Sequence, residues 1–296
     1  MRMKIDQVLV IGAGGALGHE IVRGLRTRDI DVTATYRTPR KDIEEKLTAL
    51  GARPIRLDIN DTDTLAPLIA RAKAAIFTPI LTISKIAAPF LEPNQSAVFF
   101  SSNNAAIDKQ AEIYAQLRAA EETVRQDASR ASILRPTMIY GYPGDGNLAQ
   151  LIRAMRRWPM IPMPGNGAAL QQPVFYKDLA AIAVETLLDE TAHGRVSPAA
   201  GPKPMSQREL YEIAAKAAGA RLRTFGLPLG PGAKALVMLE RSGLRLPISS
   251  TQLQRAAMDK TPQGPSPILG KTSLEEGLSQ LAAGLDEALD ESRLGA

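Results

Sequence analysis

The chain has 296 residues, of which 45% are hydrophobic, and its 36 basic and 31 acidic residues give a net charge of +5. This length and composition fit one large α/β domain with a smaller appended lobe, and the charge is too thinly spread for a nucleic-acid surface. Because the sequence has no cysteine and only two histidines, disulfides and thiolate chemistry are excluded and we expect no metal site.

The first predicted elements are a strand, a glycine turn and a helix within VLVIGAGGALGHEIVRGL, which starts at Val8. Its glycines let the backbone approach a pyrophosphate, and the N–H groups and dipole of a helix N-terminus favour the negative charge. The alternative is a structural turn that binds nothing. We predict a dinucleotide site whose cofactor-binding residues are Gly12, Gly14, Gly15, Ala16, Leu17 and Gly18.

Short apolar strands then alternate with helix-length segments. The sequence predicts strands at 32–36 and 55–59, strands that end near Thr78 and Ser102, and a strand that begins at Ala131; it also predicts a helix at 42–50 and a helix cap at Asn60 or Asp61. This alternation predicts a doubly wound parallel sheet of the Rossmann type, covered by helices on both faces.

Ligands of such sheets bind beyond the carboxyl ends of the strands. We therefore expect the crevice to be completed by residues at those ends, namely Tyr36, Arg37, Asp58, Ile59, Thr78, Pro79, Ser101 and Pro136.

The residue after the second strand selects the cofactor. A carboxylate there would bind a ribose with a free 2′-hydroxyl, whereas this chain has Tyr36 and Arg37, with Arg40 and Lys41 close behind. A guanidinium binds phosphate through a bidentate fork, so NADP is favoured over NAD. The alternative is that Arg37 is an exposed surface charge. Asp58 lies in an Asp-Ile-Asn turn, which makes it a candidate cap of the next helix.

Prolines and glycines interrupt the pattern beyond about residue 140, and WPMIPMPGNG is predicted as a loop. Helices are predicted over 179–188 and 206–218, and the basic run 153–157 beside Trp158 is expected to form a solvated helix face. We predict a dinucleotide-binding domain over 1–140 and a smaller, mainly helical substrate lobe over 141–296, with some segments returning to the sheet.

Four segments in this order resemble the short-chain dehydrogenase/reductase superfamily, specifically its extended and atypical members related to nucleotide-sugar epimerases and to NmrA-like proteins. They are GAGGALG, ILRPTMIYG at 133–141, PVFYKDLA at 173–180 and LGKTSLEEGL at 269–278. The resemblance implies a Rossmann fold and an NAD(P) cofactor, and Asp58 is similar to the family residue that contacts the adenine. It also implies oxidoreductase or epimerase activity on a small-molecule carbonyl or alcohol.

In this superfamily, catalysis uses a tyrosine, a lysine four residues later, and a serine or threonine that orients the substrate oxygen. The matching positions here are Tyr114, Arg118 and Ser102, while Asn103 occupies the position where related epimerases often carry Ser or Thr. An arginine keeps the positive charge but not the geometry of an ammonium.

The segment 108–126 is predicted as one helix whose buried stripe is Ile113, Leu117, Ala120 and Val124. The alternative to a catalytic Tyr114 is an ordinary helix tyrosine beside an arginine that pairs with Glu121 or Glu122.

On the substrate side, nucleotide-sugar enzymes of this type commonly carry an arginine seven residues before the aspartate of Asp-Leu-Ala. Here Gln171 precedes Asp178, which weakens the case for a UDP-sugar, and Asp178 is expected to be a helix N-cap.

Three functions remain open, namely an NADP(H)-dependent oxidoreductase or epimerase, an NmrA-like protein that senses NADP(H), and a structural accessory subunit. No apolar run approaches the roughly 20 residues of a membrane span, and the first strand begins too early for a signal peptide. We therefore expect a cytoplasmic protein with a small-molecule substrate and no membrane or nucleic-acid partner. A homodimer is a candidate assembly.

Overall fold

The computed structural model describes residues 5–227 and 258–294. The chain divides into two compact units. Unit 1 consists of residues 1–137, 176–200 and 262–270, and unit 2 consists of residues 138–175, 201–261 and 271–296. Each unit is therefore assembled from three separate segments of the chain. No helix in the described part of the chain is long and apolar enough to cross a membrane.

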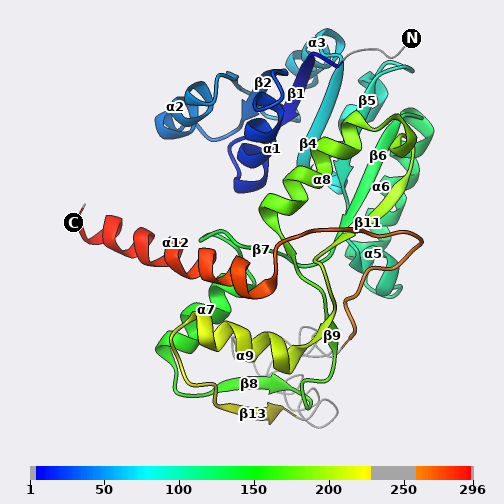
Figure 1. The fold of residues 1–296 in the computed structure, drawn as a ribbon. Coiled ribbons are helices and arrows are strands. Elements are labelled where there is room, and N and C mark those ends of the chain that lie inside the picture. The colour runs from blue at the N-terminus through cyan, green and yellow to red at the C-terminus, as the bar shows by residue number, and fades with distance from the viewer. Residues whose placement is uncertain (1–4, 228–257, 295–296) are drawn as a thin grey trace, which may run out of the picture. The chain divides into compact units, whose positions relative to one another are not determined.

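Unit 1 is built on a parallel eight-stranded sheet with the order β3-β2-β1-β4-β5-β6-β11-β14 (Figure 1). The predicted doubly wound, Rossmann-type sheet is thus confirmed. The strand order reverses between β1 and β4, which is where ligands bind in such sheets. The strands are β1 (Gln7–Ile11), β2 (Asp31–Tyr36), β3 (Arg53–Arg56), β4 (Ala74–Ile80), β5 (Ser96–Phe100), β6 (Ala131–Pro136), β11 (Val196–Ala200) and β14 (Ile268–Leu269).

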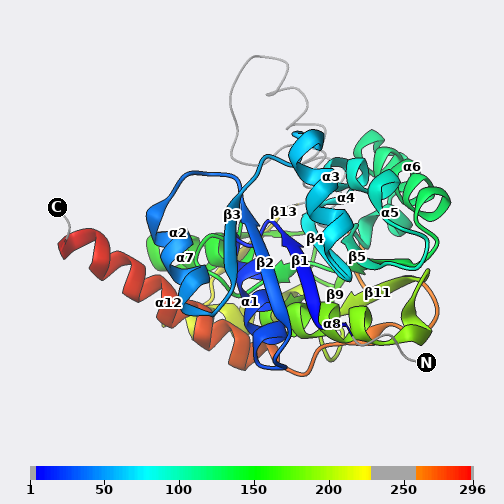
Figure 2. The ribbon, with the colours of Figure 1, turned by 90° about the horizontal axis from the view of Figure 1, so that it is seen from above.

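Helices cover both faces of this sheet (Figure 2). On one face α1 (Ala16–Arg26) packs against α8 (Tyr176–Leu188). The other face carries α3 (Thr62–Arg71), α4 (Leu81–Ser84), the 3-10 helix η1 (Lys85–Phe90) and α6 (Glu112–Asp127), which contact one another. The short α5 (Asn104–Ile107) precedes α6, and α2 (Lys41–Ala49) packs beside β3.

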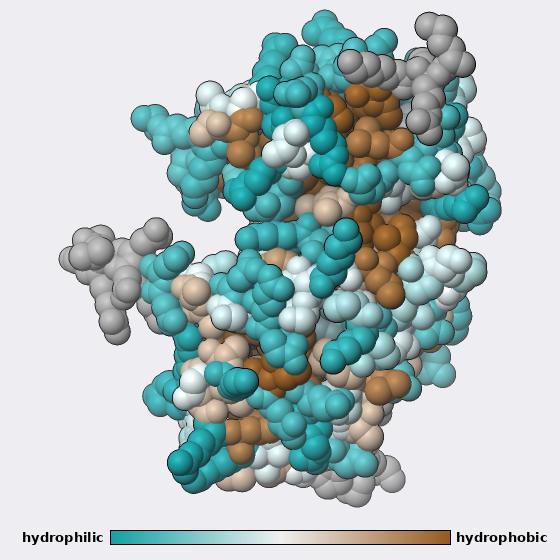
Figure 3. Space-filling view, viewed as in Figure 1, coloured by the Kyte–Doolittle hydropathy of each residue, from teal (hydrophilic) through white to brown (hydrophobic). Residues whose placement is uncertain are grey.

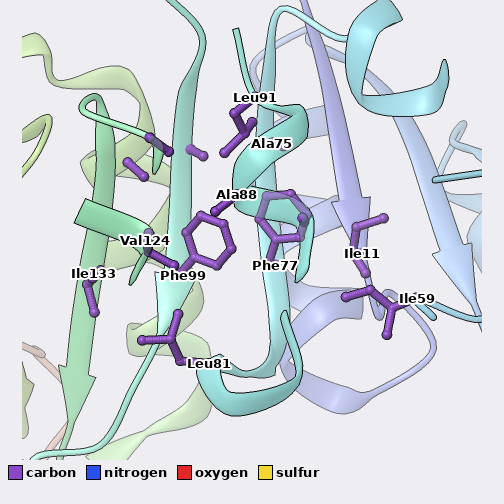
Figure 4. Close-up of a cluster of buried hydrophobic side chains, with 14 of the residues drawn as sticks. Ile11, Ile59, Ala75, Phe77, Leu81, Ala88, Leu91, Phe99, Val124 and Ile133 are labelled. Atoms are coloured by element: carbon purple, nitrogen blue, oxygen red, sulfur yellow. The ribbon is translucent and has the colours of Figure 1, made fainter. Parts of the chain in front are cut away.

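The core on the α6 side of the sheet is centred on two phenylalanines. The rings of Phe77 and Phe99 stack with their centroids 4.4 Å apart and 8° between their planes. Ile11, Val124 and Ile133 belong to the same buried cluster (Figure 4). Because these side chains come from β1, β4, β5, β6 and α6, the cluster fixes the strands whose carboxyl ends form the candidate site.

The helix predicted over 108–126 begins later than expected, at Glu112. The Asp108 carboxylate accepts hydrogen bonds from the N–H groups of Gln110 and Ala111, both at 3.0 Å, which stabilises a turn in place of a first helical turn. The predicted stripe is also wrong at Ile113, which is 53% exposed because it lies one turn before the buried part of α6; Leu117, Ala120 and Val124 are buried.

Unit 2 contains three helices, α7 (Leu148–Arg157), α9 (Gln207–Ala217) and α12 (Leu274–Leu294), among its described residues. Its strands form three short pairs. These pairs are β7 (Ile139–Tyr140) with β10 (Val174–Phe175), β9 (Leu170–Gln171) with β12 (Met205–Ser206), and β8 (Ile161–Pro164) with β13 (Thr224–Leu227).

The prediction of a loop over WPMIPMPGNG is wrong, because β8 lies within it. Pro162 and Pro164 alternate with residues that can donate, so the two prolines leave the ladder intact. The N–H group of Ile161 donates to the carbonyl oxygen of Arg223, just before β13, and that of Gly165 donates to the carbonyl oxygen of Leu227 in β13, both at 2.9 Å.

Two of the recognised segments meet inside unit 2, where Gly277 of LGKTSLEEGL packs against the fully buried ring of Tyr140. A Cβ at Gly277 would lie 2.3 Å from the Tyr140 hydroxyl. We expect Gly277→Ala to lower the free energy of unfolding by about 1–3 kcal/mol through overpacking, measured by urea denaturation.

Gly284 in the same helix is the matched control, since its nearest neighbour is a Pro143 carbon at 3.4 Å. Gly284→Ala is expected to be neutral or to stabilise the helix by up to about 1 kcal/mol. Equal stabilities of the two alanine variants would contradict the packing argument.

Candidate functional site

The glycine turn after β1 is held by two threonines from neighbouring strands. Gly12 has φ +82°, and a Cβ there would lie 2.3 Å from Thr78 Oγ1. That hydroxyl donates towards the carbonyl oxygens of Ile11 at 2.9 Å and Gly12 at 3.1 Å, while the Gly12 N–H donates to Thr35 Oγ1 at 3.3 Å. The structure therefore gives the Thr78 side chain a role in bracing the turn, and Pro79 packs against Gly12 beside it.

The glycines of the turn differ in what surrounds them. A Cβ at Gly18 would lie 2.4 Å from the Gly12 carbonyl oxygen, so this position lets α1 pack directly on the turn. A Cβ at Gly15 would have no protein atom closer than the Gly12 oxygen at 3.7 Å. Gly18 is therefore needed by the fold, whereas the space at Gly15 is free for a ligand.

Gly15 is also the N-cap of α1, and no side chain of the described residues caps this helix end. The backbone N–H groups at the start of α1, which include those of Ala16 and Leu17, therefore have no capping side chain, and Gly15 beside them is exposed. An uncapped helix N-terminus with room above it fits a pyrophosphate, because it supplies N–H donors and a favourable dipole.

At the end of β2, the Tyr36 side chain is buried and its hydroxyl donates to Glu44 Oε2 at 3.0 Å. Burial raises the pKa of Tyr36, and the adjacent Glu44 carboxylate adds to the shift. A Cβ at Gly14 would lie 3.2 Å from the Tyr36 Cβ. Tyr36 thus packs beneath the glycine turn and links it to α2.

The three cations after β2 have different surroundings. Asp42 binds the Arg40 guanidinium at two points, 3.0 and 2.6 Å, and Lys41 pairs with Glu45 at 3.4 Å. Arg37 is exposed and forms no hydrogen bond or ion pair with any residue in the described ranges, although its charge helps to lower the pKa of Asp58. Of these three cations, Arg37 is therefore the one that is free to bind an anion.

Asp58 closes a turn after β3. Its Oδ1 accepts from the backbone N–H of Asn60 at 3.0 Å and from the Asn60 amide at 2.9 Å, and these bonds hold the pKa of Asp58 below its usual range. The N-cap of α3 is Asp61, whose side chain accepts a hydrogen bond from the Thr64 N–H at 3.2 Å. Asp61 is one of the two positions predicted for this cap. Ile59, which follows β3, and Pro136, the last residue of β6, are also buried at the carboxyl ends of their strands.

Tyr114 lies in the first turn of α6, half-buried, and its hydroxyl accepts a hydrogen bond from Asn104 Nδ2 at 3.0 Å. Ser102 is next to this pair, because its Oγ accepts from the Asn104 N–H at 3.2 Å. Asn103 is buried, and its side-chain oxygen accepts from the Gln263 N–H at 3.0 Å. Asn104 was not a predicted site residue, and only its contact with Tyr114 reveals it.

Arg118 binds backbone carbonyls. Its guanidinium donates to the oxygens of Ala105 at 3.0 Å, Asp108 at 3.1 Å and Lys109 at 3.3 Å. It therefore holds the segment 105–109, which connects Asn104 to the start of α6. Its effect on the Tyr114 proton stays a prediction.

A buried ion pair that the sequence did not reveal lies below Ser101. Glu121 is 5% exposed and accepts from Arg135 Nε at 2.8 Å and Nη2 at 2.5 Å, while Ser101 Oγ donates to it at 2.5 Å. The hydrogen bonds to Glu121 raise the pKa of Arg135. The predicted pairing of Arg118 with Glu121 or Glu122 is wrong. Glu121 binds Arg135, Glu122 pairs with Arg125, and the Arg118 guanidinium donates to backbone carbonyls instead.

We expect Glu121→Gln to lower the free energy of unfolding by about 3 kcal/mol, because it leaves the Arg135 charge without its counterion in a partly buried site. Glu122→Gln is the matched control on the exposed face of α6, where loss of the pair should cost less than about 0.5 kcal/mol. Equal destabilisation of the two variants in urea melts would contradict the role of Glu121.

One prediction on the substrate side changes. Asp178 lies in the first turn of α8, which begins at Tyr176, so it is not the N-cap. The basic run on α7 is exposed, as predicted, and within this exposed face Arg156 pairs with Asp286 at 2.7 Å and Arg153 donates to the Pro143 carbonyl at 2.7 Å. Gln171 is buried within β9.

The family is decided by a match to the NmrA-like family over residues 4–238. The chain belongs to the NmrA-like family. The match covers the glycine turn, the strands β1 to β6, Tyr114 and most of unit 2's first two segments. The predicted resemblance to NmrA-like proteins is thereby confirmed.

Two curated relatives are 25% identical to this NmrA-like chain. One is the mitochondrial NADH dehydrogenase (ubiquinone) 1 alpha subcomplex subunit 9 of Arabidopsis thaliana, matched over 69% of this chain and 56% of that protein. The chain thus spans little more than half of that relative's length. The other is an NAD(P)H azoreductase of Xenophilus azovorans, matched over 77% of this chain and 80% of that protein.

The fold is shared with a nucleoside-diphosphate-sugar epimerase from Pseudomonas aeruginosa at a TM-score of 0.74. The two are 16% identical in sequence over 95% of this chain and 98% of the epimerase. This likeness extends over both units, and it concerns the fold alone.

Proposed function

We propose that this NmrA-like protein is an NADP(H)-dependent oxidoreductase acting on a small-molecule carbonyl or alcohol. The observation that carries the proposal is the open position at Gly15 above the uncapped N-terminus of α1, with an unpaired Arg37 at the end of the neighbouring strand β2. The first feature suits a pyrophosphate, and the second suits a 2′-phosphate.

The cofactor, when bound, supplies the hydride chemistry. The chain supplies the proton-transfer group, and we assign this role to the Tyr114 hydroxyl, with Ser102 orienting the substrate oxygen. Asn104 is a positioning residue, because its amide donates to the Tyr114 hydroxyl at 3.0 Å while its own N–H donates to Ser102 Oγ. Arg118 fixes the connecting segment through its three carbonyl bonds.

The test of cofactor choice is Arg37→Ala. We expect the unaltered protein to bind NADPH more tightly than NADH in calorimetry, and the variant to lose about 1.5–3 kcal/mol of NADPH binding with little change for NADH, because a charge-assisted pair is removed. Arg40→Ala is the matched control, since Asp42 already binds that guanidinium. Equal affinities of the unaltered protein for the two cofactors would remove the NADP assignment.

A second candidate function is an NADP(H)-binding sensor without turnover. The observation that favours it is that the Tyr114 hydroxyl has an amide donor beside it, while the Arg118 guanidinium is bonded to three backbone carbonyls. Tight NADPH binding without turnover in a broad screen of reductase, dehydrogenase and epimerase substrates would favour the sensor. Capture of a stoichiometric protein partner would instead favour an accessory subunit.

A further inference from the structure

Large apolar side chains are exposed to solvent around the β8–β13 pair of unit 2. Trp158 is 61% exposed, Met160 47% and Phe225 45%. All three line the same cavity of about 720 Å³, and every described residue that lines it belongs to unit 2, so the three lie around one concave surface. Hydrophobic surface reaches the outside over α9 and β8 (Figure 3). Exposed apolar side chains that gather in this way mark a binding surface.

The chain that leads from α7 into β8 carries two of these side chains. Residues 156–160 are exposed at every position, and this stretch includes both Trp158 and Met160. Apolar side chains on an exposed loop can enter the headgroup region of a membrane, where tryptophan rings are enriched.

The chain around these side chains is basic. Residues 146–177 and 213–227 contain no aspartate or glutamate. Asp286 of α12 reaches this region, but it pairs with Arg156 at 2.7 Å. The three other arginines next to the apolar side chains are exposed and form no ion pair with any residue in the described ranges; they are Arg157, Arg221 and Arg223.

These arginines flank the apolar side chains. The Arg157 guanidinium carbon lies 5.3 Å from the centroid of the Trp158 ring. The Arg223 carbonyl oxygen accepts the Ile161 N–H at 2.9 Å, so the chain that leads into β13 runs beside the chain that leads into β8. Together the side chains form one basic-aromatic surface, which consists of Arg157, Trp158, Met160, Arg221, Arg223 and Phe225.

We infer that the basic-aromatic surface docks on an anionic lipid membrane. An anionic bilayer supplies both features that this surface needs, because its apolar layer lies beneath a surface of negative charge. The apolar side chains enter the interface, and the arginines bind the anionic headgroups.

Such docking needs no membrane-spanning helix. It replaces the expectation that the protein has no membrane partner, which rested on the lack of an apolar run long enough to span a bilayer. The inference goes beyond the proposed function, because it needs neither NADP(H) nor turnover.

The test is co-sedimentation of the full chain with vesicles of phosphatidylcholine alone and of phosphatidylcholine mixed with phosphatidylserine. We expect binding to the mixed vesicles only, and weaker binding as the salt concentration rises, because salt screens the attraction. Trp158 reports insertion, since it is the single tryptophan of the chain. Its emission should shift to shorter wavelength on the mixed vesicles and should be quenched by lipids with brominated acyl chains.

The arginines are tested together in one variant. Each cation near an anionic surface strengthens binding about 5-fold, so loss of all three should lower the partition coefficient about 100-fold. This variant carries Arg157→Gln, Arg221→Gln and Arg223→Gln. The matched control removes three exposed cations of unit 1 and lowers the net charge equally, but should bind as the unaltered protein does; it carries Arg53→Gln, Arg71→Gln and Lys73→Gln.

The apolar contribution is tested with Trp158→Ser, which should sediment less with the mixed vesicles. Leu269→Ser is the matched control, because Leu269 is also exposed, at 46%, but belongs to unit 1. Circular dichroism melts check that every variant is folded.

The inference is overturned if the unaltered protein does not bind the mixed vesicles at low salt, if it binds without quenching of Trp158, or if the two triple variants lose affinity equally. Binding to poly-glutamate without binding to the mixed vesicles would also overturn it, and would indicate an acidic protein surface as the partner. None of these outcomes depends on the result of the cofactor experiments.

Discussion

Gly15→Val abolishes binding of both NADPH and NADH while leaving the protein folded; this is the expected result with the largest effect on the cofactor. The position is exposed, and the nearest protein atom to a Cβ there lies 3.7 Å away, so the fold itself has room for a side chain. The branched side chain would occupy the space that a pyrophosphate needs above the first turn of α1. Calorimetry with each cofactor measures the loss, and circular dichroism with thermal melting checks the fold.

Two glycines provide the comparison. Gly146→Val should change neither binding nor stability, because nothing lies within 4 Å of a Cβ at that position. Gly18→Ala should destabilise the fold, because its Cβ would lie 2.4 Å from the Gly12 oxygen. Unchanged NADPH affinity in Gly15→Val would mean that the glycine turn is structural and binds no cofactor.

Those strands of the sheet that are continuous apolar runs could be predicted from the sequence. The segments that became β1, β2, β4, β5 and β6 are buried or nearly so, which gives them a continuous hydrophobic pattern. β14 has only two residues and β11 contains a proline, so neither has such a pattern. β8 was not predicted because its two prolines are typical of a loop. The prolines alternate with residues that have an N–H group, and this alternation is what allows the strand to pair.

The candidate site was predictable as a set of positions but not as a set of roles. The sequence treats Gly15 and Gly18 alike, and only the distances show that one faces open space and the other faces the Gly12 carbonyl. Similarly, Arg37 and Arg40 differ because Asp42 binds one of them. Glu121 and Arg135 are 14 residues apart on α6 and β6, so their pairing depends on tertiary packing.

If the protein is an enzyme, Tyr114→Phe should reduce turnover by about 10²- to 10⁴-fold, the usual contribution of a general acid or base. The substitution keeps the ring in place on α6 and removes only the hydroxyl that bonds to Asn104. NADPH affinity should be nearly unchanged, so calorimetry serves as the control beside the rate measurement. A variant that turns over its substrate as fast as the parent would remove Tyr114 from the mechanism.

Arg118→Lys tests what the arginine contributes to the same site. A compact ammonium has no planar fork with which to reach carbonyls of Ala105, Asp108 and Lys109 together. We therefore expect a less stable 105–109 segment and a lower turnover, because the segment positions Asn104 next to Tyr114. Arg125→Lys, an exposed ion-pair residue on the same helix, is the control and should leave the rate unchanged. Turnover that is retained or raised in Arg118→Lys would show that positive charge alone is what the site requires.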